Sequence, residues 1–509
     1  MYYSIQYFVE KGIPQLEKVQ KSFMQNPLDM GKCVNEVKQI MLELGRKFLS
    51  EMLGTCNTML EDSVKRRESW QIKDRSEKHL LTSLGEIAYI HTRFQEKTTG
   101  ESAYLLDRIM GLTPHTRLSP DAQASLLEEA AQSSYEKAGR LSGGEGSVSR
   151  ETVMRHVHRL RVPSYKKEEA VEKRRVKYLY VEADEDHIAL QFHKEKGDIK
   201  RWKGQGDNGQ IVKLVYVHEG YEESGGKRKK LKEAVYFGGV YGGKENEKLW
   251  EEVKEYIEGR YDLEALERIY FQSDGGSWMK KGVEMLGGTF VLDEFHIKKY
   301  VKRLVRGCGK EEEEETVRKY LERGEKKKLE EWVEEKKKGL EEKKKKRVEE
   351  SLRYLEKNWK GIRMRIKKEE GVIGSSTESH VSHVLSGRMS SRPMGWSKEG
   401  AGKLSALRIY WKNGGSIEEL VRGVEKEEKK AEEERVYSAQ EIITWEKRTQ
   451  KRNGKYIEAL QARISNQTGM KVYFQAAIRG ICGKNHQDST GTVGGLPEHV
   501  QTDKEKYIR

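Results

Sequence analysis

One short stretch, residues 268–278, constrains the fold of this chain more than any other. The run Ile269–Phe271 joins a β-branched residue to two aromatic ones, which is typical of a buried strand. Two glycines follow Asp274 and allow a sharp turn, after which a helix is expected to begin near Trp278. The pattern predicts a strand, a turn and a helix, with Asp274 at the strand end, where α/β sheets usually carry functional groups. Taken alone, the stretch is explained equally well by an aspartate with no role beyond the turn.

The charge balance favours a polyanionic partner. The 509 residues include 97 Lys and Arg against 83 Asp and Glu, which gives a formal net charge of +14 and a pI of about 9.2. Nucleic acid is the first candidate and an anionic membrane surface the second; a solvated basic surface is the alternative. The length is sufficient for about two to four domains.

Cysteine usage and hydropathy both favour a cytoplasmic protein. The four cysteines form no CxxC pair, which argues against a disulfide framework and against a zinc knuckle. No apolar run approaches the roughly 20 residues of a membrane-spanning helix, and the N-terminal residues lack the pattern of a signal peptide. We therefore expect a cytoplasmic protein without a membrane partner.

Composition and periodicity divide the chain into seven segments. Two of them are expected to form a single mixed α/β core, interrupted by an insertion rich in Lys and Glu. The predicted segments are an N-terminal helical region with a hairpin (1–100), a helix-turn-helix region (101–165), the first part of the core (175–309), the charged helical insertion (310–370), the last part of the core (371–400), a C-terminal helical region (401–482) and a disordered tail (483–509).

Two adjoining helices are the first candidate for nucleic-acid binding. Residues 130–141 predict one helix, a glycine-rich turn follows, and Ser149 can cap a second helix that runs to Leu160. The second helix has one apolar face, and the rest of its surface is basic. This is typical of a helix-turn-helix whose second helix enters the major groove; an ordinary amphipathic helix is the alternative. The side chains expected to contact DNA are Arg150, Arg155, His156 and Arg159.

From Lys177 the periodicity changes from helix to strand. Alternation over residues 178–183 predicts a strand that runs into Asp184. A series of strands and then an alternation of helices and strands follows, which is typical of a mixed α/β sheet. The further strands are expected at 187–193, 210–217, 234–241 and 289–292, and the helices at 246–261, 278–286 and, with a basic surface, through Arg306.

Three acids stand where such a sheet would bring them together. Asp184 and Asp274 end neighbouring strands, and Glu378 falls in the first turn of a helix that Ser376 or Thr377 can cap. Clustered carboxylates repel one another unless cations neutralise them, and two Mg²⁺ ions about 4 Å apart would do so while supporting phosphodiester cleavage and strand transfer. Three unrelated acids at turns and a helix cap are the alternative.

Four motifs follow one another in a fixed order, and three of them contain these acids: YVEADEDHIAL around Asp184, FQSDGGSW around Asp274, VLDEFHIKKY around His296, and SSTESHVSHVLSGRMSSRP around Glu378. The set resembles the DDE transposases of bacterial insertion sequences, most closely the ISLre2 group. The resemblance extends over most of the chain, from about residue 60 to about residue 400.

The resemblance implies an RNase H-like catalytic core with a helical insertion before the final glutamate. It implies that Asp184, Asp274 and Glu378 are catalytic acids that bind Mg²⁺ or Mn²⁺. Asp186, two residues along the same strand face, is the alternative for the first acid. The resemblance also implies that His296, in an Asp-x-x-His element with Asp293, contacts DNA or the scissile phosphate; a packing histidine at a helix start is the alternative.

Further polar groups follow Glu378. His380 and His383 lie one helical turn apart, but no other ligands are near in the sequence, so an orienting or DNA-contacting role is favoured over a zinc pair. Arg388 and Arg392 lie in a polar loop suited to phosphate groups, and we expect both to contact DNA.

These observations predict a transposase that binds the terminal inverted repeats of its insertion sequence and catalyses metal-dependent DNA cleavage and strand transfer. The expected partner is double-stranded DNA, as terminal repeats and as target, and the resemblance implies that further copies of the chain form an oligomer on that DNA. Such a protein would be associated with the bacterial nucleoid when bound. The alternatives are a non-catalytic DNA-binding protein of the same fold and an RNase H-like nuclease acting on RNA or branched DNA.

Overall fold

The computed structural model describes residues 3–112, 115–141, 147–163, 172–192, 209–222, 230–392 and 394–422. Within them the chain divides into two compact units, with the boundary between Glu51 and Met52. The first unit is helical, and Glu51 accepts hydrogen bonds from the backbone amide and hydroxyl of Ser4 at 2.7 and 2.6 Å. Its elements are α1 (Tyr3–Tyr7), the π-helix η1 (Phe8–Gly12), α2 (Ile13–Gln25) and the first part of α3 (Met30–Asp62).

The second unit begins with an antiparallel sheet. The predicted hairpin is present, but its first strand starts at Trp70, in a stretch predicted to be helical. Residues 71–77 of this strand are mostly polar and exposed, so they give little hydrophobic alternation from which a strand could be recognised. The elements of this part are α4 (Val64–Ser69), β1 (Trp70–Thr82), β2 (Gly85–Glu96), β3 (Ser102–Tyr104) and α5 (Leu105–Met110).

Three helices follow. The helix predicted over residues 130–141 is interrupted at Ser133, so that α6 (Pro120–Gln132) and α7 (Tyr135–Leu141) are separate. The second predicted helix is confirmed as α8 (Arg150–Arg159), and the hydroxyl of Ser149 accepts a hydrogen bond from the Thr152 amide at 3.2 Å. The glycine-rich turn predicted between α7 and α8 lies outside the described residues.

A five-stranded mixed sheet forms the centre of the second unit. Its strand order is β6-β5-β4-β7-β8; β4, β5 and β6 pair antiparallel, whereas β4, β7 and β8 pair parallel. The bounds are β4 (Tyr178–Ala189), β5 (Gly209–His218), β6 (Val235–Gly239), β7 (Arg268–Ser273) and β8 (Thr289–Leu292). The mixed α/β class is thereby confirmed.

One predicted strand boundary is wrong. The sequence suggested that a strand ends at Asp184 and a second begins at His187, but β4 continues through both positions to Ala189. Its pairing with β5 is unbroken from Tyr180 to Ala189. Three consecutive polar residues, Asp184, Glu185 and Asp186, resemble a strand end in the sequence, but all three lie within β4.

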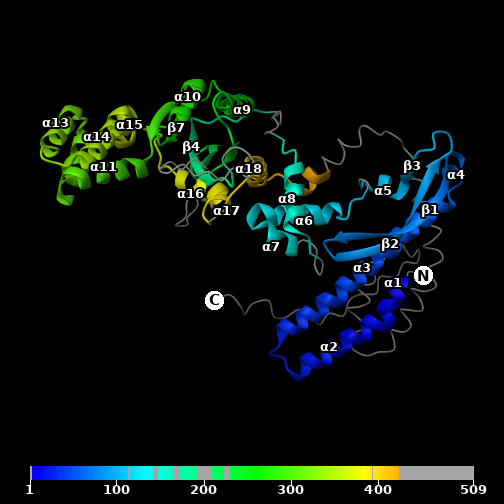
Figure 1. Cartoon of the computed structure of the whole chain (residues 1–509). Coiled ribbons are helices and arrows are strands. Elements are labelled where there is room, and N and C mark those ends of the chain that lie inside the picture. The colour runs from blue at the N-terminus through cyan, green and yellow to red at the C-terminus, as the bar shows by residue number, and fades with distance from the viewer. Residues whose placement is uncertain are drawn as a thin grey trace, which may run out of the picture. The chain divides into compact units, whose positions relative to one another are not determined.

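Helices cover both faces of the sheet (Figure 1). On one face, α9 (Glu245–Arg260) and α10 (Ser277–Leu286) pack against the odd-numbered side chains of β4. The other face is covered by the elements around Glu378. These are α16 (Thr377–Val381), the π-helix η3 (Ser382–Ser386), α17 (Gly387–Met389) and α18 (Lys398–Lys412).

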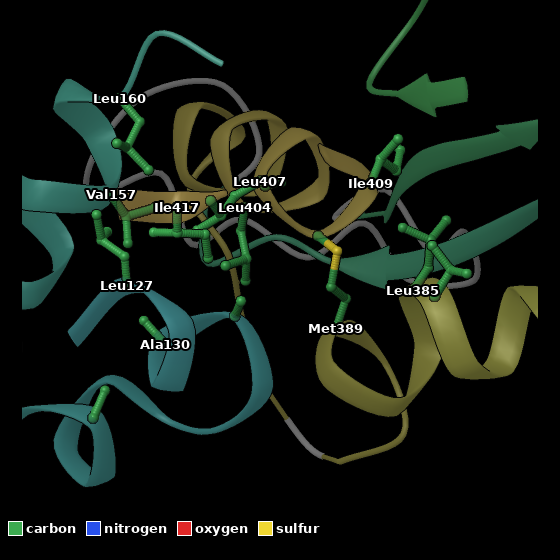
Figure 2. Packing of buried hydrophobic residues seen from close by; sticks show 14 of the residues in the cluster. Leu127, Ala130, Val157, Leu160, Leu385, Met389, Leu404, Leu407, Ile409 and Ile417 are labelled. Carbon is green, nitrogen blue, oxygen red and sulfur yellow. The ribbon is translucent and has the colours of Figure 1, made fainter. Parts of the chain in front are cut away.

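The helices α6 and α8 share a core with this second face. Leu127 and Ala130 of α6, Val157 of α8 and Leu404 of α18 belong to one cluster of buried side chains, together with Leu214 of β5 (Figure 2). The predicted DNA-binding helices are therefore packed onto the sheet unit through α18.

The Lys- and Glu-rich insertion is a helical subdomain with its own core. The seam of apolar residues predicted there is confirmed, because Val348, Leu355 and Ile362 are fully buried. Its helices adjoin the β8 edge of the sheet (Figure 1). The helices of the insertion are the 3₁₀-helix η2 (Glu311–Glu313), α12 (Glu314–Arg323), α13 (Lys326–Lys336), α14 (Glu342–Lys357) and α15 (Trp359–Lys367). The helix α11 (Glu294–Cys308) precedes the predicted insertion, but its buried side chains belong to the same core, so it is part of this subdomain.

The last residue that the structure describes is Arg422. Most of the predicted C-terminal helical region and the whole predicted tail at 483–509 lie outside the described residues. Across the described ranges, no helix combines the length and the apolar character needed to cross a membrane.

Candidate functional site

Two of the three predicted acids lie side by side at the middle of the sheet. β4 and β7 are parallel neighbours, and Glu182 is paired with Gln272. The same register continued by two residues brings Asp184 level with Asp274, which directly follows β7. The sheet topology thus brings together two carboxylates that are ninety positions apart in the sequence.

The pKa of Asp184 depends on the charges of the other two predicted acids. The pKa of Asp184 is raised to about 7, mainly by burial and in smaller part by the charges of Asp274 and Glu378, while the Glu185 amide and His296 act to lower it. The Glu185 amide donates to Asp184 Oδ1 at 2.8 Å. Asp274, Glu378 and His296 therefore all lie close enough to Asp184 for their charges to act on it.

The backbone around Asp274 is held in place from two sides. The Gly276 amide donates to Asp274 Oδ1 at 2.9 Å, and the hydroxyl of Tyr354 donates to the Asp274 carbonyl at 2.5 Å. Gly275 has a φ of +83°, and a Cβ there would lie 2.5 Å from Asn358 Oδ1. Only glycine fits that turn, as the sequence pattern indicated.

Asp293 and His296 form a pair at the start of α11. Asp293 is the N-cap, and its Oδ2 lies 3.2 Å from Nδ1 of His296. Burial favours the neutral ring, but the Asp293 hydrogen bond and the charges of Asp274 and Asp184 outweigh it and raise the pKa of His296. The ring is therefore predisposed to carry a positive charge beside the carboxylates.

Glu378 reaches the site from a different layer. It lies in the first turn of α16, as predicted, and its side chain is exposed. The loop that leads into α16 is attached to β4 by Glu182, a fully buried carboxylate that was not singled out from the sequence. Glu182 Oε2 accepts hydrogen bonds from Tyr216 Oη (2.7 Å), Ser375 Oγ (2.9 Å), Thr377 Oγ1 (2.8 Å) and the Ser376 amide (2.9 Å), and Oε1 lies 3.1 Å from His218 Nε2.

This network keeps Glu182 ionised. Burial on its own would raise the pKa of Glu182, but hydrogen bonds from His218, Tyr216 and the Ser376 amide lower it below the usual value. The charged carboxylate thereby fixes the start of α16 against the sheet. The role of Glu182 could have been suspected from the sequence, because it is a charged residue within the strand predicted at 178–183 and needs hydrogen-bond partners if it is buried.

Asp186, the alternative first acid, has a different environment. It is buried, and its Oδ1 accepts a hydrogen bond from Ser390 Oγ at 2.7 Å. The carboxylate of Asp184, by contrast, forms no hydrogen bond with another side chain in the described residues, and its pKa is raised by burial and then by the charges of Asp274 and Glu378. These contacts favour Asp184 over Asp186 as the partner of the other two acids.

The two histidines after Glu378 lie in different environments. His380 is stacked on Tyr216, with ring centroids 4.7 Å apart, and its Nδ1 lies 2.7 Å from the hydroxyl of Tyr236. Burial lowers the pKa of His380, so the ring is held neutral within the fold. His383 is exposed. The expectation that they form no zinc pair stays a prediction, and an orienting role fits His380.

The predicted DNA contacts fall into two groups. Arg150, Arg155 and Arg159 are exposed on α8, and His156 is partly buried, with its pKa lowered by burial and by the two neighbouring arginines. Arg392 is exposed.

The prediction that Arg388 contacts DNA is wrong. It is only 4% exposed, its Nε donates to the Ala130 carbonyl at 3.1 Å, and its guanidinium lies over the ring of Trp396 at 4.9 Å. Arg388 therefore joins α6 to the region around α17, and it does not lie on a phosphate-contacting surface. Its place in a polar Ser-rich loop had suggested otherwise.

The chemistry of the donor set suits a hard divalent cation, because carboxylate oxygens are the ligands that Mg²⁺ and Mn²⁺ prefer. The high pKa of Asp184 is what buried acids adopt without a neutralising cation. In the conformation described, no three His, Cys, Asp or Glu side chains of the described ranges are grouped closely enough to hold a metal ion.

Comparison with known proteins identifies the family. The profile of an uncharacterised protein family, UPF0236, matches residues 23–430. Three similar proteins of Caldanaerobacter subterraneus subsp. tengcongensis, each named only as a UPF0236 protein, are 32%, 33% and 32% identical over 423, 402 and 433 residues. These matches cover 81%, 78% and 82% of this chain and 84%, 81% and 87% of the relatives. The printed name of the first joins eleven gene designations, and that of the second joins four. The chain thus belongs to the UPF0236 family.

Proposed function

We propose that this chain is a DNA transposase that cuts and joins phosphodiester bonds with the acids Asp184, Asp274 and Glu378. The observation that carries the proposal is the register of the sheet, which brings Asp184 of β4 level with Asp274 after β7, together with the charges of Asp274 and Glu378, both of which act on Asp184.

The sheet supports the proposal at the level of the fold. Three antiparallel strands followed by two parallel ones, in the order β6-β5-β4-β7-β8, is the arrangement expected of an RNase H-like core. The first acid would lie on the central strand β4, the second after its parallel neighbour β7, and the third on the helix α16 that follows the insertion.

The names of the relatives supply a separate argument. A protein whose name joins eleven gene designations from one organism is what we expect of a gene that multiplies by transposition. A non-catalytic DNA-binding protein or a housekeeping nuclease has no such reason to occur under many designations.

The proposed roles follow from the contacts. Asp184, Asp274 and Glu378 would hold Mg²⁺ or Mn²⁺, which when bound supplies Lewis-acid activation of a water or a 3′-hydroxyl. Asp293 orients the His296 ring, whose raised pKa suits it to face a phosphate oxygen at the same site. Glu182 positions the start of α16 and with it Glu378. The exposed arginines of α8 would contact the terminal repeats.

The test is cleavage of DNA that carries the sequences flanking this gene, with and without Mg²⁺, by the wild type and by Asp274→Asn. We expect the wild type to nick the DNA and Asp274→Asn to lose at least about 100-fold in rate, because a ligand of the reacting centre is removed. Glu251→Gln, which changes an exposed acid on α9, is the matched control and should cleave like the wild type.

The rival functions give different results. Equal cleavage by the wild type and Asp274→Asn would remove this acid from the reaction and refute the assignment. Binding of the flanking DNA without cleavage by any variant would favour the non-catalytic protein, and cleavage confined to RNA–DNA hybrids or branched DNA would favour the nuclease.

A further inference from the structure

A strongly basic groove lies between α11 and α14 of the helical subdomain. It has a volume of about 850 Å³, and seven of the residues that line it are Lys or Arg, whereas none is acidic. Five of them are on α11: Lys298, Lys299, Lys302, Arg303 and Arg306. Lys344 and Arg347 contribute from α14. This set, which we name the basic groove, is separate from the carboxylates of the proposed active site.

The amphipathic pattern of α11 produces one wall of the groove. Ile297, Val301 and Leu304 are buried in the core of the insertion, so the intervening basic residues must point away from it. The lining residues on α11 recur at helical spacings from Phe295 to Arg306 and are exposed on one side, apart from the partly buried Gly307.

Close packing fixes the second wall against the first. Tyr300 of α11 stacks on Tyr354 of α14, with ring centroids 3.6 Å apart. A Cβ on Gly307 would lie 2.6 Å from Val348 Cγ2, so the two helices approach closely at that point. The spacing of the two basic rows is therefore determined by packing contacts beneath them.

Acids outside the groove neutralise only part of its charge. Lys298, Arg303 and Arg306 pair with Glu294, Glu350 and Glu311 at 2.5, 2.8 and 3.4 Å. Within the described residues, by contrast, the ammonium groups of Lys302 and Lys344 and the guanidinium of Arg347 form no ion pair. Holding several unpaired cations in one concave surface is unfavourable unless a polyanion binds there.

The groove is attached to the proposed active site through both of its walls. α11 starts at the pair Asp293 and His296, and the exposed Phe295 in the groove lies edge-on to the His296 ring at 5.3 Å. On the other wall, Tyr354 of α14 donates its hydrogen bond to the Asp274 carbonyl. A polyanion in the groove would therefore continue toward the carboxylates.

We propose that the basic groove binds the phosphate backbone of duplex DNA next to the carboxylate site. The proposal rests on the function proposed above and adds a substrate contact to it. From Lys298 to Arg306 the helix rises about 12 Å, which corresponds to about three phosphates of one DNA strand. We expect the contact to be independent of base sequence, because cationic side chains spread along a groove match the repeating phosphates of the backbone.

The test compares the salt dependence of DNA binding by the full chain and by the triple variant Lys302→Ala, Lys344→Ala, Arg347→Ala. These three side chains are exposed and have no ion-pair partner among the described residues, so their removal leaves no acid unpaired. Binding to a 30-base-pair duplex of arbitrary sequence is measured by fluorescence anisotropy between 50 and 300 mM NaCl. We expect weaker binding and a slope of log K against log [salt] that is smaller by about 2.7, since each phosphate contact contributes about 0.9.

The matched control removes the same charge elsewhere. Lys248, Lys327 and Lys338 are exposed on α9, on α13 and just after α13, and their replacement by alanine should leave the slope unchanged. Circular dichroism and thermal melting establish that both triple variants fold. Equal slopes for the two variants would overturn the proposal, as would the same loss of binding on single-stranded RNA or on vesicles of phosphatidylglycerol. Failure of the groove leaves Asp274-dependent cleavage intact, so it is distinguishable from failure of the proposed function.

Discussion

At the scale of single residues, two acids on one face of β4 differ in how the fold treats their charge. Glu182 is fully buried, yet donors from four side chains and one backbone amide stabilise its ionised form. Asp184 receives one backbone hydrogen bond, and burial, with the charges of two other acids, raises its pKa to about 7. The first carboxylate is satisfied by the protein itself, whereas the second is left in need of a counter-charge.

The raised pKa of Asp184 predicts how the free energy of unfolding depends on pH when a chelator removes metal ions. The folded chain keeps this proton up to about pH 7, whereas the unfolded carboxyl loses it near pH 4. Since the folded state binds more protons in that window, the free energy of unfolding should fall as the pH rises from 4 to 7, by up to about 4 kcal/mol. Asp184→Asn removes this contribution.

Urea unfolding at pH 5, 6, 7 and 8 in EDTA measures the effect. Asp184→Asn should lose less stability than the wild type over this range, while Glu251→Gln should follow the wild type. Parallel curves for Asp184→Asn and the wild type would contradict a raised pKa at this position.

At the scale of elements, α8 has two faces with different tasks. Val153 and Val157 are completely buried in the core shared with α6 and α18, and Arg155 and Arg159 point to solvent. The sequence indicated this division correctly, because valines at helical spacing leave no other face for the core. That the exposed face contacts DNA stays a prediction. Substitutions on the two faces test it, because one face should affect DNA binding and the other stability.

We expect the double variant Arg155→Ala, Arg159→Ala to bind the DNA that flanks the gene more weakly. The slope of log K against log [salt] should be smaller by about 2. The free energy of unfolding should change by less than about 0.5 kcal/mol. Val157→Ala should do the reverse, lowering stability by about 2 kcal/mol with DNA binding retained below the melting temperature. Anisotropy and urea unfolding provide the measurements. Unchanged DNA binding in the arginine variant would make α8 an ordinary packing helix.

At the scale of the whole molecule, the second unit unites segments that the sequence suggested were separate regions. Side chains of α6, α8, β5 and α18 form a single cluster, and Arg388 and Arg408 donate hydrogen bonds to the carbonyls of Ala130 and Ala131 at the end of α6. The DNA-binding candidate and the carboxylate site are therefore expected to be coupled in stability.

Leu404→Ala tests this coupling, because Leu404 is fully buried in the shared cluster. The substitution should lower the free energy of unfolding by about 3 kcal/mol. Hydrogen exchange read by mass spectrometry should show that peptides of α8 and of β5 lose protection together. Loss of protection in α8 alone would indicate that the helices form an independent unit.

Local pattern was sufficient for much of this protein, and tertiary structure decided the rest. The strand before Asp274, the strand at 289–292, the helix that begins at Glu378 and the apolar seam of the insertion were predictable, because each depends on the periodicity of neighbouring side chains. The continuation of β4 past Asp184 was not, since its polar residues are paired by β5 rather than by their neighbours in sequence. The role of Glu182, the burial of Arg388 and the basic groove between α11 and α14 depend on contacts across tens to hundreds of residues. The sequence alone determined which residues could carry charge and which apolar residues had to be buried; only the folded chain decided which charged residues would be buried and which would lie next to one another.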